Sequence, residues 1–348
     1  NKIKNYLETE RKNIFYITGF FDIFFIFITE NSSYICLSEM LLEQCQKVLN
    51  ENGISKFFQL LVISKKNNDF YFQTIKEAFK YIKVKENIKN LSYPEIYRKF
   101  DFYKVLDNLF ELNNTFSILN YMRMTKDSFE LENIKKACQE TYKISKKIPS
   151  MLERKSKLTE LDIAKKIDIL SIKSCGYKAF DSIVAFGKNT AFPHYIPSEN
   201  VFYNKKRPEL LVDFGTKYKN YCADMTITKF YEKSNSDIYK KMANAVLEAH
   251  SKVIEIIKPG ILAKNLDLKV REIFDKYKMT QYFIHNTGHG VGLDIHELPS
   301  INYSDETILK ENMVVAIEPG LYIKEIGGVR IEDTILITKN NHQILTIK

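Results

Sequence analysis

The segment HNTGHGVGLDIHELP, residues 285–299, places three of the six histidines of the chain within twelve positions and separates them with glycines. His285 and His289 have the i, i+4 spacing of a helical zinc motif, but the glycines of GHGVG, residues 288–292, disfavour a helix. The same glycines match only a fragment of a dinucleotide-binding loop, because the full G-x-G-x-x-G sequence opening a helix is missing. Two interpretations remain: a metal site, or ordinary histidines in a turn-rich strand. The rest of the sequence has to decide between them.

Four acidic residues each follow or enter a strongly apolar segment. They form two pairs, with a turn between the members of each pair. Asp213 lies in LLVDFG and Asp224 follows in YCADMT, while Glu318 lies in VVAIEPG and Glu332 follows in GVRIEDT. A turn between the members of each pair places both acids of a hairpin on one face of a sheet. A lone acid at a strand end is usually solvated, but four ionised carboxylates converging in a core require a cation. The pattern therefore favours a metal site, with His289 as a nitrogen ligand from an adjacent strand.

The order of these segments recurs along the chain. A shift of 105 residues places Leu161-Asp162 on Leu266-Asp267 and Asp213 on Glu318, so a carboxylate falls on a carboxylate. Each copy contains two helical segments followed by strand-like segments, although few residues are identical between the copies. We therefore expect two related halves with one site where they meet.

The N-terminal part has the alternating pattern of a smaller α/β domain. NIFYITG and IFFIFIT predict strands, SEMLLEQCQKVLN predicts a helix, and FFQLLVIS predicts another strand. From about residue 126 the apolar spacing becomes helical, and Thr159 is expected to cap a helix that ends at Gly176. The sequence predicts an α/β domain over residues 1–120 and a second domain, carrying the acids and histidines, over residues 121–348.

The charge of the chain does not indicate a nucleic-acid partner. The formal net charge is +9, but only 7 of the 52 basic residues are arginine, and the lysines are scattered among asparagine and glutamate. Arginine is the preferred residue for phosphate and base recognition, so this composition is typical of a lysine-rich solvated surface.

The cysteines and the apolar segments indicate a cytoplasmic protein with no membrane partner. Five cysteines are widely spread without a C-x-x-C pair, which favours free thiols in a reducing compartment. Residues 1–13 are polar and mixed in charge, unlike a signal peptide. The most apolar run, residues 14–29, is interrupted by Gly19 and Asp22 and is shorter than the roughly 20 residues of a membrane helix.

Several motifs together resemble the signatures of the pita-bread metallopeptidases, and most closely those of the branch that contains Xaa-Pro aminopeptidases and prolidases (Xaa-Pro dipeptidases). They are PHY at 193–195, VDFG…ADMT, GHGVGLDIHE, IEPGLY and GVRIED. The resemblance covers about residues 121–348 with order and spacing preserved, and the first 115 residues more loosely, through NIFYITGF. It implies a C-terminal pita-bread domain with pseudo-two-fold halves, preceded by a smaller α/β domain.

The resemblance implies a centre of two divalent metal ions. Asp213 would bind one ion, His289 and Glu318 the other, and Asp224 and Glu332 would bridge them. Oxygen and imidazole ligands suit manganese, which we expect, and equally cobalt, iron or zinc.

Four further residues match functional positions of the family. His194, His285 and His296 match histidines that hold substrate and stabilise the tetrahedral intermediate, and Arg330 matches an arginine that steadies the site. Glu318 would also serve as the general base. The remaining histidines, His250 and His342, are expected at the surface.

The expected function is hydrolysis of the bond between an N-terminal residue and a following proline, with a peptide as the partner and a homodimer as the assembly. An Xaa-Pro aminopeptidase is our first expectation, an Xaa-Pro dipeptidase the alternative, and an inactive peptide-binding protein on the same scaffold a third.

One position departs from the family pattern, since DMTIT has Ile227 where DMTRT is common. The departure removes no implied metal ligand.

Overall fold

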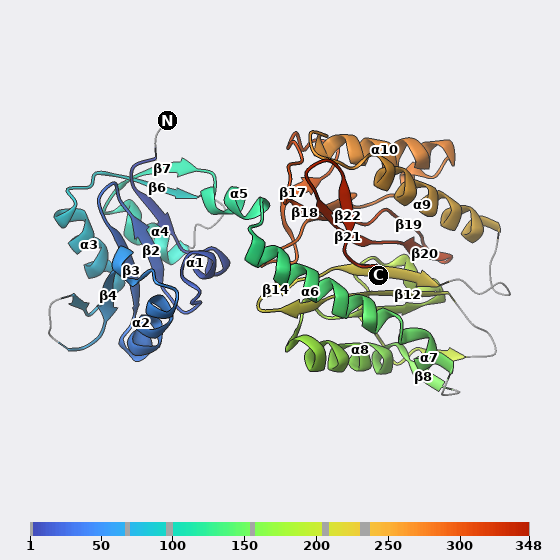
Figure 1. Ribbon diagram of the computed structural model, residues 1–348, viewed down its shortest axis with the longest axis horizontal. Coiled ribbons are helices and arrows are strands. Elements are labelled where there is room, and N and C mark those ends of the chain that lie inside the picture. The colour runs from blue at the N-terminus through green and yellow to red at the C-terminus, as the bar shows by residue number, and fades with distance from the viewer. Residues whose placement is uncertain are drawn as a thin grey trace. The chain divides into compact units, whose positions relative to one another are not determined.

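The computed structural model describes residues 3–66, 70–94, 100–153, 157–203, 209–229 and 237–347. The chain divides into two compact units, Asn1–Asn120 and Tyr121–Lys348 (Figure 1). Helices and strands occur in both units, which confirms the expected α/β class. Among the residues described, no helix combines the length and the apolar character needed to cross a membrane.

The first unit contains a seven-stranded sheet with the order β5-β4-β3-β2-β1-β6-β7. Strands β1, β2 and β3 pair antiparallel, and parallel pairs extend the sheet outward on both sides. Phe25 on β2 stacks on Phe79 of α3 at 4.3 Å between ring centroids, inside a core of buried apolar residues. The elements are β1 (Tyr6–Glu8), α1 (Arg11–Thr18), β2 (Phe25–Ile28), β3 (Ser33–Ser38), η1 (Glu39–Leu41), α2 (Leu42–Glu51), η2 (Ser55–Phe57), β4 (Gln59–Ile63), β5 (Tyr71–Phe72), α3 (Ile75–Lys85), β6 (Asn90–Pro94), α4 (Phe100–Asp107) and β7 (Glu111–Thr115).

One strand prediction in this unit was wrong. NIFYITG lies mainly in helix α1, because the chain has a capping residue before the first turn of the helix and another after its last turn. The Glu10 side chain accepts hydrogen bonds from the backbone N–H groups of Lys12 and Asn13, and Gly19 closes the helix in the left-handed conformation at φ 73°. Strands β2 and β4 and helix α2 lie where the sequence predicts them.

The second unit begins within α5 (Ile118–Met124), and its first half contains two long helices followed by short strands. Thr159 caps α8 through the N–H of Asp162, and Gly176 ends the helix in the left-handed conformation, which confirms both predicted helix limits. The elements are α6 (Ser128–Ser145), α7 (Ile148–Glu153), β8 (Lys157–Thr159), α8 (Glu160–Cys175), β9 (Tyr177–Lys178), β10 (Ile183–Phe186), η4 (Gly187–Ala191), β11 (Val201–Tyr203), β12 (Leu210–Phe214), β13 (Thr216–Tyr218), β14 (Tyr221–Cys222) and β15 (Met225–Lys229).

The second half repeats this order. In each half the central strands form an antiparallel sheet, β10-β12-β15 in the first and β16-β18-β21 within the five-stranded sheet of the second. The small hairpins β13-β14 and β19-β20 also correspond. The elements are α9 (Asp237–Ile256), α10 (Ala263–Lys276), η5 (Thr280–Tyr282), β16 (Gly288–Gly290), β17 (Glu297–Ile301), β18 (Val314–Ile317), β19 (Gly320–Ile323), β20 (Gly327–Arg330), β21 (Asp333–Ile337) and β22 (His342–Ile344).

The strands of the second unit lie between two helix pairs, with α6 and α8 along one side and α9 and α10 along the other (Figure 1). Each half therefore packs its sheet on its own helices, and a buried apolar cluster lies in each of the two layers. This arrangement confirms the pseudo-two-fold halves expected from the sequence.

Candidate metal centre

Strand alternation determines where the four acids point. Val212 and Phe214 of β12 belong to the apolar cluster beneath α8, so Asp213 between them points from the opposite face of the sheet. The same rule applies on β18, where Val315 and Ile317 pack in the second cluster and Glu318 follows them.

The second member of each pair obeys the same alternation. Ile227 of β15 packs against the first cluster and Ile335 of β21 lies in the second, so Asp224 and Glu332 fall on the face opposite the helices. The position of Ile227 also explains its residue type, because a side chain that packs on an apolar core is better aliphatic than charged.

These acids line one cavity of about 780 Å³ together with the predicted histidines and Arg330. Asp224, His289 and Glu332 offer ligand atoms that all lie within 4.8 Å of one another. The Nε2 atom of His289 lies 3.6 Å from a Glu318 oxygen and 3.7 Å from an Asp224 oxygen. Asp213 lines the same cavity but lies outside this tightest group.

The environment of these groups suits a bound cation. Burial, followed by the nearby carboxylates of Glu332 and Asp213, raises the pKa of Asp224 well above its usual value, and burial likewise raises the pKa of Glu332. The pKa of Glu318 is raised by burial to about 7. Without a cation these carboxyls therefore retain protons that a metal ion would displace.

His289 is prepared to act as a nitrogen ligand. Its Nδ1 donates to the carbonyl oxygen of Gly290 at 3.0 Å, which leaves the lone pair on Nε2, the atom that faces Asp224 and Glu318. Burial lowers the pKa of His289 to about 4, so the ring is neutral at pH 7. A buried oxygen of Asp213, Oδ1, has no hydrogen-bond partner within the described part of the chain. This donor set and this unpartnered oxygen fit divalent metal ions.

Arg330 connects several of these groups. Its Nη2 donates to Asp213 at 2.6 Å, its Nη1 donates to the Tyr322 hydroxyl at 2.7 Å, and its Nε donates to Thr226 at 3.1 Å. The Thr226 hydroxyl in turn donates to Glu332 at 2.6 Å. The guanidinium therefore fixes two of the acids, one directly and one through Thr226, which had no signal in the sequence.

The three predicted substrate histidines all line the cavity but differ in their contacts. His285 donates from Nδ1 to the Asn286 carbonyl at 2.7 Å and its Nε2 lies 2.9 Å from the Tyr322 hydroxyl, so both of its nitrogens have partners. The His296 ring stands edge-on to His289 at 4.3 Å between centroids, and burial lowers its pKa. His194 lies on the irregular segment after η4.

The remaining two histidines are not surface residues, and that expectation was wrong. The His250 side chain on α9 is 13% exposed and lies 3.3 Å from the carboxylate of Asp333, next to Glu332. His342 is half-buried and donates from Nδ1 to the carbonyl of Ile257 at 2.9 Å. Both histidines hold β-strands of the second half to α9 or to its end.

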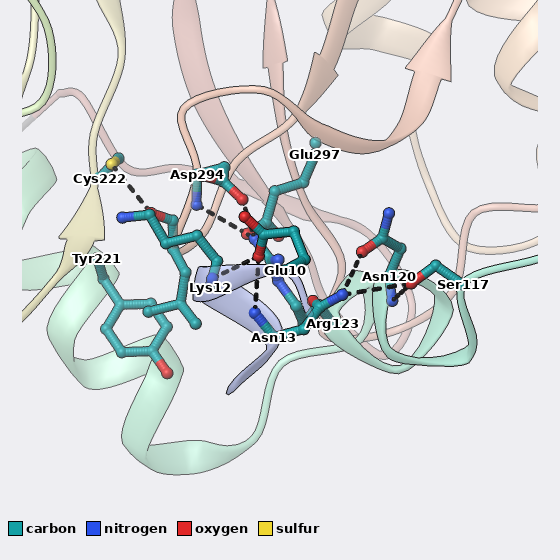
Figure 2. Close-up of polar contacts among 12 residues, drawn as sticks. Glu10, Lys12, Asn13, Ser117, Asn120, Arg123, Tyr221, Cys222, Asp294 and Glu297 are labelled. Atoms are coloured by element: carbon teal, nitrogen blue, oxygen red, sulfur yellow. Dashed lines mark hydrogen bonds and ion pairs between the residues drawn. The ribbon is translucent and has the colours of Figure 1, made fainter. Parts of the chain in front are cut away.

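A buried ion-pair cluster anchors the turn that carries His296 (Figure 2). The Glu297 carboxylate is paired with Arg123 and, at 3.3 Å, with Lys126, and it accepts from the backbone N–H of Asp294 at 3.0 Å. A Cβ added to Gly292 would lie 2.5 Å from a Glu297 oxygen, so a larger residue there would displace the paired carboxylate. Sequence reasoning did not identify this cluster.

The turn is also attached to the first half of the unit. The backbone N–H of Cys222 donates to the carbonyl of Gly292 at 2.8 Å, and its thiol lies 3.8 Å from the carbonyl of Leu293 (Figure 2). Cys222 ends β14 two residues before Asp224, so these contacts tie the His296 turn to the segment that carries this acid.

Comparison with known proteins agrees with this geometry. The sequence model of metallopeptidase family M24 matches residues 132–339 of this chain. A Xaa-Pro dipeptidase of Pyrococcus horikoshii is 35% identical over 353 residues, covering 99% of this chain and 93% of the relative. A putative Xaa-Pro aminopeptidase of Mycoplasma genitalium is 39% identical over 226 residues, covering 63% of this chain and 61% of that relative.

The fold agrees as well. The solved structure of a Xaa-Pro dipeptidase from Bacillus anthracis superposes with a TM-score of 0.87 at 27% identity, covering 99% of this chain and 93% of that structure. The similarity therefore extends through both units. The chain belongs to metallopeptidase family M24 and has the pita-bread fold that its sequence motifs implied.

Proposed function

We propose that this metallopeptidase is a Xaa-Pro dipeptidase. The supporting observation is the degree of similarity among relatives that match the whole chain. A prolidase from P. horikoshii covers 99% of this chain at 33% identity and a TM-score of 0.86. An X-Pro aminopeptidase from Thermotoga maritima also covers 99% of it, but at 28% identity and a TM-score of 0.80. The dipeptidase alternative is therefore better supported than the aminopeptidase that we expected first.

The predicted ligands would hold two divalent ions, for which we propose manganese. These ions would supply Lewis acidity that activates water at neutral pH and polarises the scissile carbonyl. Carboxylate oxygens and one imidazole are ligands that manganese accepts readily. The proposed ligands are Asp213, Asp224, His289, Glu318 and Glu332.

Glu318 would accept a proton from the attacking water and pass it to the departing proline nitrogen. Its carboxylate lines the cavity beside the other proposed ligands, where it can take a proton from one group and return it to another. His194 and His296 would donate to the substrate from the cavity wall. His285 would act differently, since its two nitrogens already contact Asn286 and Tyr322 and thereby support Arg330.

Substrate length tests the proposal. The purified protein is treated with a chelator, reloaded with Mn²⁺, and assayed on Ala-Pro, on Ala-Pro-Gly and on Met-Ala-Ser. We expect Ala-Pro to be hydrolysed with a kcat/KM at least about tenfold higher than that of the tripeptide, corresponding to about 1.4 kcal/mol of transition-state discrimination. Faster cleavage of Ala-Pro-Gly would support the aminopeptidase instead. Cleavage of Met-Ala-Ser alone would exclude both proline-directed activities.

Two further properties belong to this proposal. We propose a reducing, cytoplasmic environment, since all five cysteines are free and four of them are buried. We also propose a homodimer, on the basis of the family resemblance. Light scattering of the purified protein would show twice the chain mass of 40.8 kDa if the dimer forms.

A further inference from the structure

His194 lies on a segment without regular secondary structure. Residues 192–200 connect η4 to β11, and no helix or strand is assigned within them. The segment contributes His194, Tyr195 and Ile196 to the wall of the metal cavity. Ile196 is 84% exposed, so apolar packing does not hold this part of the segment in place. Its conformation must be fixed by polar contacts.

Glu160, the first residue of α8, provides most of those contacts. Its Oε1 accepts hydrogen bonds from the backbone N–H of Phe186 at 2.8 Å and from the amides of Asn189 at 2.9 Å and Asn200 at 3.2 Å. Its Oε2 accepts from the Tyr195 hydroxyl and the Ser198 hydroxyl, both at 2.8 Å, and from the Ser198 N–H at 3.3 Å. The donors flank His194 in the sequence, with Phe186 and Asn189 before it and Tyr195, Ser198 and Asn200 after it.

The backbone of α8 adds two further bonds. The N–H of Glu160 donates to the carbonyl of Asn200, and the N–H of Leu161 donates to the carbonyl of Ser198, each at 3.0 Å. These are N–H groups of the first helical turn, which have no partner inside the helix. The start of α8 therefore holds the segment through backbone and side chain together.

The Glu160 carboxylate is unusual because it is fully buried and yet has no cationic partner in the described part of the chain. Six donors and the amino end of a 16-residue helix stabilise its charge instead. A carboxylate offers about four lone-pair sites, so these donors saturate both oxygens. Such an arrangement fixes geometry, because moving the segment would leave a buried charge with fewer hydrogen bonds.

We propose that Glu160 is a positioning residue that holds His194 toward the substrate in the metal cavity. The inference rests on the proposed Xaa-Pro hydrolysis, in which His194 donates to the substrate. Glu160 itself does not line the cavity, and it acts through the segment that carries His194.

The test uses Glu160→Gln, which keeps the shape of the side chain but replaces one acceptor oxygen with an NH₂ group facing donors. We expect kcat/KM for Ala-Pro to fall by about tenfold to a hundredfold, as for a misplaced substrate-contacting group. Bound manganese after dialysis should be unchanged. The matched control is Asp162→Asn on the same helical turn, whose exposed carboxylate accepts from the backbone N–H of Thr159 at 3.1 Å and makes no bond to residues 192–200. It should keep parent activity.

A double-mutant cycle with His194→Ala shows whether the effect passes through His194. If it does, Glu160→Gln should lower kcat/KM by less than about twofold in the His194→Ala background. Equal losses in both backgrounds would overturn the proposal, since Glu160 would then act by another route. If Glu160→Gln does not fold, Tyr195→Phe and Ser198→Ala remove donors from the other side, and their effects should likewise disappear without His194.

A second readout is independent of activity. The chain contains no tryptophan, so Ile196→Trp introduces a single tryptophan beside His194, which can be excited at a longer wavelength than the 21 tyrosines absorb. In that background Glu160→Gln should lower the fluorescence anisotropy and increase quenching by acrylamide, while Asp162→Asn should not. Unchanged fluorescence would overturn the positioning role. If no Xaa-Pro peptide is hydrolysed by the parent protein, the proposed function fails, and the fluorescence still reports whether Glu160 orders the segment.

Discussion

At the scale of single residues, the candidate metal centre consists of buried carboxylates whose mutual repulsion a cation would relieve. Asp224, Glu318 and Glu332 are brought together on faces that strand alternation turns away from the helices. Burial raises the pKa of each of them, and for Asp224 and Glu332 the neighbouring acids add to the effect. The protein therefore binds protons at this site under conditions in which the unfolded chain has released them.

This linkage predicts that two quantities change with pH in opposite directions. They are the carboxyl contribution to the stability of the metal-free protein and the stabilisation that added Mn²⁺ provides. In the metal-free protein, a folded-state pKa raised above the unfolded value means that the contribution of these carboxyls to the free energy of unfolding falls as pH rises from about 4.5 toward 7. The lowered pKa of His289 acts in the opposite direction, but only up to about pH 6.5, so the carboxyls alone determine the trend above that pH. Bound manganese would displace the protons, so the stabilisation that it adds should increase over the same interval. Thermal denaturation with chelator and with Mn²⁺, between pH 5.5 and 8, measures both trends.

Asp224→Asn provides the internal comparison. The substitution removes one crowded charge, so at pH 8 we expect the metal-free variant to be more stable than the metal-free parent, by about 1–3 kcal/mol. Added Mn²⁺ should no longer raise its melting temperature. A metal-induced shift that is independent of pH in the parent protein would contradict the carboxylate linkage.

At the scale of elements, local sequence patterns predicted most of the second unit correctly. Continuous apolar runs identified β12 and β18, and the cap signals at Thr159 and Gly176 predicted both ends of α8. In the first unit the apolar spacing of NIFYITG was compatible with either element, and the caps at Glu10 and Gly19 decided for a helix.

Contacts between distant residues were the part that could not be predicted. The sequence pattern placed Glu160 in the first turn of a helix and gave it no other role. Its hydrogen-bond donors lie 26 to 40 residues further along the chain. The Arg123–Glu297 pair spans 174 residues, and neither residue belongs to a recognisable spacing. The candidate ligands were accessible to sequence reasoning because each lies beside an apolar strand, whereas these supporting residues are defined only by the folded chain.

The turn between β16 and β17 should depend on its buried ion pairs. Lys126 and Arg123 hold the pKa of Glu297 below its usual value, although burial alone would raise it. Glu297→Gln leaves both cations buried with one fewer charge, and we expect a loss of about 3 kcal/mol in the free energy of unfolding. Denaturant unfolding at pH 7 measures the loss. Glu306→Gln is the matched control, because its ion pair with Lys264 is exposed, and it should change stability little.

The ion pairs of Glu297 should contribute less to the stability of the protein in acid. A depressed pKa contributes stability above the unfolded value, and this contribution is lost as pH falls through the folded value. The difference in stability between the parent and Glu297→Gln should therefore shrink below about pH 4.5. A difference that stays constant down to pH 3 would show that the charge of Glu297 is not what anchors the turn.

At the scale of the whole molecule, the candidate ligands come from both halves of the second unit. Asp213 and Asp224 lie in the first half, and His289, Glu318 and Glu332 lie in the second. The backbone N–H of Glu332 also donates to the carbonyl of Thr226, and Thr334 exchanges two hydrogen bonds with the backbone of Asp224. Metal binding at this site would therefore join two sheets that each have their own apolar core.

Hydrogen exchange can detect this coupling. On addition of Mn²⁺ to metal-free protein, we expect protection to increase together in β12 and β15 of the first half and in β18 and β21 of the second, because opening either half removes ligands. Residues 3–94, in the other unit, should be unchanged. Glu332→Gln alters only the second half, yet it should abolish the metal-induced protection in both. Protection that rises only in residues 237–347 would place the metal on one half and contradict a centre shared between them.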